Sequence, residues 1–106
     1  MHSTRHTLPL ATRKKSIALL AALLADAVDL YSQIKQAHWN VRGPSFIALH
    51  ELFDKIAEET EDHVDSLAER IAQLGGQPRG TARIAASNSR LKEYPLDISE
   101  GPDHGS

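Results

Sequence analysis

Apolar residues recur along the chain at the spacing of two long helices. From residue 17 onward, alternating steps of three and four connect Ile17, Leu20, Leu24, Ala27, Tyr31, Ile34 and His38. The same steps connect Phe46, His50, Phe53, Ala57, Thr60, Val64, Leu67, Ile71 and Leu74. Such steps keep side chains on one side of a helix, which has about 3.6 residues per turn. The pattern therefore predicts two helices, at about residues 13–42 and 45–74.

Glycine and proline mark the ends of both predicted helices. Gly43 suits the position after a helix, and Pro44 suits the first turn of the next one, so a tight turn is expected here. Gly75 and Gly76 follow the second helix, with Pro78 just beyond them. Two helices joined by so short a turn form an antiparallel hairpin.

The predicted organisation has three parts. A flexible tail covers residues 1–12, and the helical hairpin covers residues 13–76. Residues 77–106, which are rich in Gly, Pro and Ser, are expected to form a loop with one short helix at about residues 81–86. Because a hairpin alone cannot bury stripes of this length, the chain is expected to pack against further helices.

Composition narrows the class of protein. A chain of 106 residues has room for a single domain, and an aromatic content of 5% favours helices over a β-rich fold. The chain contains no cysteine, which excludes disulfides, thiolate metal sites and cysteine nucleophiles and is compatible with a reducing compartment. The formal net charge of −2 excludes nucleic-acid binding through overall basic character.

The longest apolar run, residues 17–25, is far shorter than the roughly 20 residues needed to cross a bilayer, so we expect no transmembrane helix. The basic residues 13–15 before this run and the small residues 25–27 after it would also suit a secretory signal. Against a signal, the helical periodicity continues beyond the point where cleavage would occur.

The second predicted helix is strongly acidic, with eight acidic residues and one basic residue between residues 51 and 69. A solvated helix face is the commoner explanation of such a run. However, five ligand-type side chains also share one band of the helix: His50, Asp54, Glu61, Asp65 and Glu69. Within this band, His50/Asp54 and Asp65/Glu69 are two pairs with i, i+4 spacing. Asp54 and Asp65 are roughly 16 Å apart at about 1.5 Å per residue, so one ion cannot contact both. A second copy, antiparallel about a two-fold axis, would bring the two pairs together.

Histidine provides one more candidate ligand. His38 lies six residues before Pro44, and His50 six residues after it, so the two can face each other across the hairpin. A lone histidine on an apolar stripe is more often a core residue, but the match next to Asp54 favours ligation. Imidazole and carboxylate ligands suit iron, Mn²⁺ or Zn²⁺, and spacing alone does not select among them.

Two intrachain metal motifs fit poorly. His50-Glu51-Leu52-Phe53-Asp54 differs from the His-Glu-x-x-His motif of zinc hydrolases, because Asp54 replaces the second histidine. The Glu-x-x-His pair of di-iron bundles is absent, because Thr60 lies three residues before His63. A site shared between two copies fits the spacing better.

Several segments resemble one family, the Dps branch of the ferritin-like superfamily, whose members are DNA-binding proteins from starved cells. The matching motifs are QAHWNVRGP at residues 36–44, FIALHELFD at 46–54, DHVDSLAER at 62–70 and LGG at 74–76, with YPLDI at 94–98 as a weaker continuation.

The resemblance implies a cytoplasmic, hollow dodecamer that oxidises Fe(II), preferably with hydrogen peroxide, and stores the ferric mineral; many members also bind DNA. The ferroxidase ligands it implies are His38, His50 and Asp54 of one subunit and Asp65 and Glu69 of its two-fold mate. Trp39 would lie beside the site, either to intercept oxidising equivalents or as a packing aromatic.

The chain also departs from the family, whose members are four-helix bundles. Residues 102–106 stand where the third long helix would begin, so only the first helix pair is expected here. The first 16 residues carry Arg5, Arg13, Lys14 and Lys15 and no acid, which makes this arm a candidate for DNA binding. The alternative to an iron-oxidising enzyme is a non-catalytic DNA-compacting or helix-pairing protein whose carboxylates are only solvated.

Overall fold

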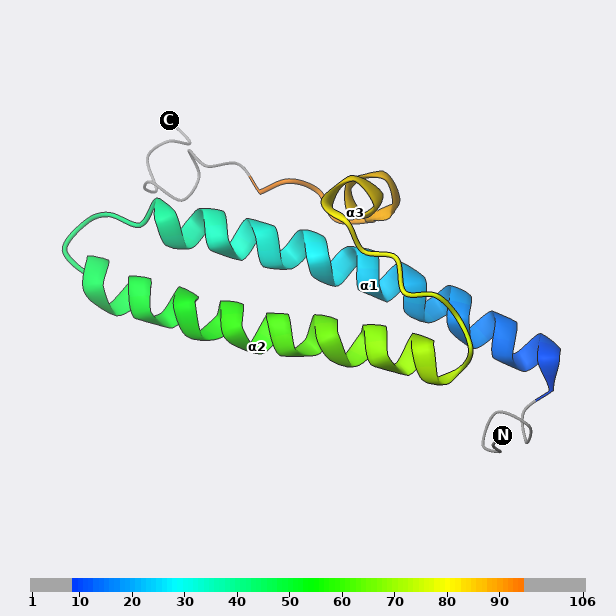
Figure 1. The fold of residues 1–106 in the computed structure, drawn as a ribbon. Helices are drawn as coiled ribbons and strands as arrows, with labels where there is room; N and C mark the ends of the chain where they lie inside the picture. The colour runs from blue at the N-terminus through cyan, green and yellow to red at the C-terminus, as the bar shows by residue number, and fades with distance from the viewer. Residues whose placement is uncertain (1–8, 95–106) are drawn as a thin grey trace.

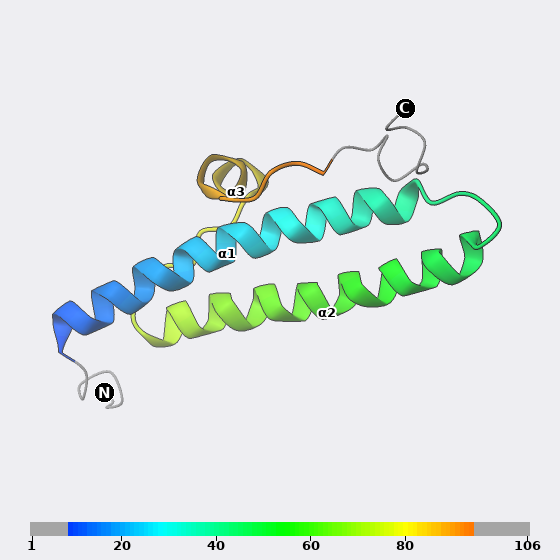
Figure 2. The same ribbon diagram turned by 180° about the vertical axis from the view of Figure 1, so that it is seen from behind.

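The computed structural model describes residues 9–94, and these form three helices: α1 (Leu10–Trp39), α2 (Phe46–Gln73) and α3 (Ala82–Asn88). Helices α1 and α2 run antiparallel, and α3 lies on the side of α1 away from α2 (Figures 1 and 2). The described residues contain no strand. The predicted all-α class is confirmed, with the hairpin as one half of a four-helix bundle.

Helix α1 begins at Leu10 rather than at residue 13, so residues 10–12 are not part of a flexible tail. The helix starts after Pro9, whose carbonyl accepts a 3.0 Å hydrogen bond from the Arg13 amide. It ends at Trp39 rather than near residue 42, because Asn40 closes the last turn. The Asn40 amide donates to the Ala37 carbonyl, and its side chain donates to the Gln36 carbonyl at 2.8 Å.

Helix α2 ends in a Schellman motif. The Gly76 amide donates to the Ile71 carbonyl at 2.9 Å, and the Gly75 amide donates to the Ala72 carbonyl at 3.0 Å. Gly75 adopts a φ of 91°, which favours glycine over residues with a side chain. Gly76 lies directly against Ile17 of α1, so the turn fixes how the end of α2 meets the start of α1.

The tightest packing lies in the half of the hairpin that is remote from the α1–α2 turn. Leu24 and Ala27 of α1 contact Leu67 and Ile71 of α2, and Ile71 is only 1% exposed. These residues belong to the two stripes predicted from the sequence. Their burial sets the register of the two helices and thereby determines which residues meet nearer to the turn.

Helix α3 packs against the side of α1 that faces away from α2, and its Ala85 is buried. The helix covers Ala82–Asn88, slightly later than the predicted 81–86, because the Thr81 side chain caps it by accepting the Ile84 amide at 3.2 Å. Residues 95–106, the rest of the predicted loop, lie outside the described part of the chain.

The segment after α3 is tied to the outer side of α1. Asp26 accepts hydrogen bonds from the Arg90 amide at 2.8 Å and from the Arg90 Nε at 2.9 Å. Further along, the Gln33 side chain donates to the Lys92 carbonyl and accepts from the Tyr94 amide at 2.8 Å. The chain is thereby directed along α1 toward the end that carries the α1–α2 turn (Figure 1).

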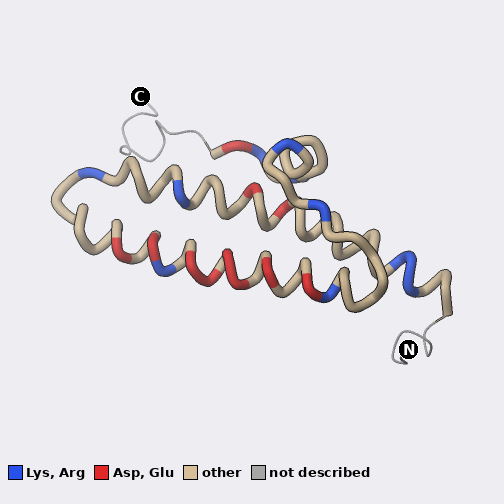
Figure 3. The backbone as a smooth tube through the Cα atoms, viewed as in Figure 1, with Lys and Arg blue, Asp and Glu red and all other residues tan. Residues whose placement is uncertain are grey.

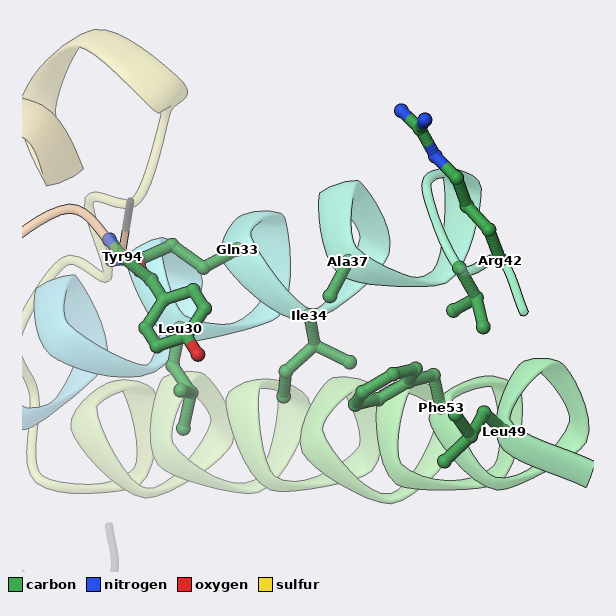
Figure 4. Close-up of a pocket in the computed structure, with 9 residues that line it drawn as sticks. Leu30, Gln33, Ile34, Ala37, Arg42, Leu49, Phe53 and Tyr94 are labelled. Atoms are coloured by element: carbon green, nitrogen blue, oxygen red, sulfur yellow. The ribbon is translucent and has the colours of Figure 1, made fainter. Parts of the chain in front are cut away.

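An apolar groove of about 440 Å³ opens between α1 and α2 near that turn. Its lining residues are Leu30, Gln33, Ile34, Ala37, Val41, Arg42, Leu49, Phe53 and Tyr94 (Figure 4). Several other leucines are exposed, among them Leu19 at 60% and Leu52 at 50%. Although the longest apolar run is short, helix α1 as a whole is long and apolar enough to cross a membrane by length and composition. Core helices of soluble proteins and signal sequences near the N-terminus share this property. The groove, the exposed leucines and the apolar α1 are all typical of a helix pair that packs against further helices.

Gly76→Ala is expected to lower the free energy of unfolding by about 1–3 kcal/mol. An added Cβ would stand 2.9 Å from Cγ2 of Ile17 and 2.9 Å from Cγ2 of Ile71, so the end of the hairpin must shift. Urea denaturation followed by circular dichroism measures this change. Gly80→Ala is the control: an added Cβ there would lie 3.6 Å from its nearest atoms, in Leu24 and Val28, which is ordinary van der Waals contact, so a smaller loss is expected. Equal losses in the two variants would contradict the packing argument.

Acidification is expected to release the segment after α3. The hydrogen bonds from the side chain and amide of Arg90 lower the pKa of Asp26 from its ordinary value. A lowered pKa means that the tether is intact above pH of about 4 and is lost as the pH falls further. The chemical shift of the Arg90 amide should report this transition, and Asp26→Asn should abolish it while Glu93→Gln leaves it unchanged. A midpoint at or above the ordinary carboxyl value would contradict this assignment.

Candidate metal centre

The two histidines predicted to face each other across the hairpin do so. The ring centroids of His38 and His50 are 3.8 Å apart with an interplanar angle of 36°, and the Phe46 ring lies 5.4 Å from that of His50. His38 ends the apolar stripe of α1, and His50 lies in the first turns of α2. Their contact therefore follows from the register that the buried residues impose.

Asp54 lies one helical turn beyond His50 and next to His38. The distance from His38 Nε2 to Asp54 Oδ1 is 3.7 Å, which is too long for a hydrogen bond. Two ligands that each lie about 2.1 Å from a metal ion are separated by at most about 4.2 Å. The distance between the imidazole nitrogen and the carboxylate oxygen is thus one that a shared ion can bridge.

The same carboxylate oxygen has a second neighbour that the sequence analysis missed. Lys35 Nζ lies 3.9 Å from Asp54 Oδ1. Lys35 is one turn before His38 on α1, so the i, i+3 spacing of a lysine and a histidine opposite an acid was the signal that could have found it.

His38 is buried without satisfying its polar atoms. Its side chain is 11% exposed, and neither Nδ1 nor Nε2 has a hydrogen-bond partner among the described residues. A buried polar atom without a partner costs stability unless something else binds it. A metal ion between Nε2 and Asp54 Oδ1 would fill this role for Nε2, and imidazole and carboxylate are ligands that iron accepts.

Asp65 and Glu69 lie toward the other end of α2, where both are exposed. The helix spacing keeps them roughly 16 Å or more from Asp54. Within residues 9–94, no three His, Asp or Glu side chains converge closely enough to hold an ion. A single copy therefore brings together His38, His50 and Asp54 loosely and leaves the second carboxylate pair apart.

Acidic residues recur along the whole length of α2, whereas most of the lysines and arginines drawn in colour lie elsewhere (Figure 3). Such a distribution is typical of a solvated helix face or of a surface that attracts cations. Burial alone does not separate the two alternatives, because Glu58, Glu61 and Asp62 are all exposed.

The other predicted functional residues lie near the ends of α1. Trp39 is 69% exposed and follows His38 directly. Arg13, Lys14 and Lys15 belong to the first turns of α1, as the predicted start of the first helix implied, whereas Arg5 lies outside the described residues.

A sequence profile described as "Ferritin-like domain" matches residues 17–101. A "DNA protection during starvation protein" of Agrobacterium fabrum is 43% identical over 103 residues, which cover 97% of this chain and 64% of that protein. The solved structure of "DpsC from Streptomyces coelicolor" matches with a TM-score of 0.80 and 38% identity, over 83% of this chain and 51% of that one. A "Fine tangled pili major subunit" of Haemophilus ducreyi is 38% identical and covers 93% of this chain and 54% of that protein.

The profile match and the hairpin define the class as a ferritin-like helical protein. Within that class, the chain belongs to the Dps family. It spans between about half and two thirds of the length of these relatives, which agrees with the expected half of a four-helix bundle.

His38→Leu is expected to stabilise the metal-free protein. Leucine removes both unpartnered ring nitrogens from a buried position, so the free energy of unfolding should rise by about 1 kcal/mol. Thermal denaturation in the presence of a chelator measures the change. His63→Leu, at an exposed position of α2, should give no such gain. A large loss of stability in His38→Leu would show that the imidazole is a structural core residue.

Proposed function

We propose that this protein oxidises Fe(II) at sites shared between two copies and sequesters the ferric product, with hydrogen peroxide as the oxidant. Iron is the substrate of this reaction. The observation that carries the proposal is the buried, unpartnered imidazole of His38 beside His50 and Asp54. Membership of the Dps family, whose relatives include proteins named for DNA protection during starvation, supports it.

In the proposed site, His38 and His50 present neutral imidazole nitrogens and Asp54 presents a carboxylate. Nitrogen and oxygen ligands of this kind suit ferrous iron, and the carboxylate also stabilises the additional charge of the ferric product. Because Asp65 and Glu69 are exposed and too far from Asp54 within one chain, they would complete the site from a second copy.

The chemistry is a one-electron oxidation at each iron. Two Fe(II) ions give up two electrons, and one hydrogen peroxide accepts them with two protons to form two water molecules. This balance consumes the oxidant without releasing a hydroxyl radical. Trp39 follows His38 and is exposed, so we assign it the role of intercepting an oxidising equivalent that leaves the site.

Storage of the product requires an assembly larger than one chain. A dodecameric cage with the acidic residues of α2 near the iron path is the arrangement we propose, together with a cytoplasmic location and DNA as a further partner. The exposed Lys14 and Lys15 on α1 are available for DNA phosphates.

His50→Ala combined with Asp54→Ala is expected to abolish rapid oxidation of Fe(II) by peroxide, because two of the proposed ligands are lost. Stopped-flow absorbance of the ferric product measures the rate. The matched control is Glu59→Ala with His63→Ala, which removes another exposed acid and histidine at i, i+4 spacing on the same helix. The control should oxidise Fe(II) like the unaltered protein. Unaltered rates in the His50/Asp54 variant would instead favour the non-catalytic alternative, a helix-pairing or DNA-compacting protein.

A further inference from the structure

Asp54 Oδ1 lies between an imidazole and an ammonium group. His38 Nε2 is 3.7 Å away and Lys35 Nζ is 3.9 Å away, both from α1, while the carboxylate comes from α2. The Lys35 side chain is 26% exposed and that of Asp54 is 55% exposed. The carboxylate at the centre of the proposed site therefore already has a positively charged neighbour.

A divalent cation that binds Asp54 must compete with this neighbour. The Lys35 ammonium and a cation bound at Asp54 repel each other, and the repulsion is stronger near a protein surface than in bulk water. The four-carbon stem of lysine lets the ammonium move away, but the ion pair with Asp54 is then lost. Either way, Lys35 opposes the binding of a metal at Asp54.

We propose that Lys35 is the resident counter-ion of Asp54 and sets the affinity of the site by having to be displaced when a divalent cation binds. The inference rests on the proposed function, because it takes Asp54 as a metal ligand. Lys35 is not itself a ligand. Its charge disfavours Fe(III) more than Fe(II), so it keeps the substrate exchangeable and promotes departure of the oxidised product toward storage.

Titration with Co²⁺ alone, by calorimetry and by its visible absorption, tests this assignment without turnover. Lys35→Met keeps the length of the side chain and the helix propensity but removes the charge, so Co²⁺ should bind about three- to tenfold more tightly. Lys35→Arg keeps the charge and should bind as the unaltered chain does. Lys55→Met removes the same charge from the residue after Asp54, which points about 100° away around α2, and should leave the affinity within about twofold.

Unchanged or weaker binding by Lys35→Met would overturn the inference, since a lysine that merely orients Asp54 would have to weaken binding when it is removed. Absence of Co²⁺ binding in every variant would overturn it as well. The double variant of His50 and Asp54 separates the two proposals. If that variant loses Co²⁺ binding while Lys35→Met does not tighten it, only the role of Lys35 fails. If the double variant binds Co²⁺ like the unaltered chain, the metal site itself is wrong.

Discussion

The packing of α1 against α2 determines everything else in this structure. Leu24 and Ala27 interlock with Leu67 and Ile71 and fix the helix register at one end of the hairpin. Because both helices are rigid over many turns, that register also determines what meets at the other end. There it brings together not two apolar residues but the imidazoles of His38 and His50. The candidate site is thus a continuation of the core in which the side chains change from apolar residues to histidines.

The two ends of the hairpin consequently differ in how completely their side chains are packed and hydrogen-bonded. At one end, the glycine turn after α2 closes the core around Ile71. At the other, an apolar groove remains between the helices, and a buried histidine has no partner. Unsatisfied groups are costly and are found where function requires them. The tether between Asp26 and Arg90 leads the chain toward this open end, the direction from which the further helices of a bundle would have to come.

Much of this arrangement was predictable from the sequence, because it follows from periodicity. The stripes identified both helices, and equal spacing of His38 and His50 from Pro44 predicted their contact. Helix ends were less predictable, because single local hydrogen bonds decide them, such as the one from the Asn40 side chain that closes α1. The i, i+3 spacing of Lys35 and His38 made Lys35 a candidate neighbour of Asp54, but this spacing does not establish the contact itself. The contact depends on the rotation of α1 relative to α2, which only the packed core sets.

The fold by itself does not establish an iron-oxidising enzyme. One relative of comparable similarity is named as a pilus subunit, so the same helical hairpin occurs in a protein named for an architectural role. The two roles differ in the polar and charged residues that they require at the end of the hairpin near the α1–α2 turn. A purely structural helix pair would gain stability from an apolar residue at position 38, whereas this chain keeps a buried imidazole there beside a carboxylate and an ammonium group. A cation bound beside Asp54, as proposed above, would offset the stability given up at His38.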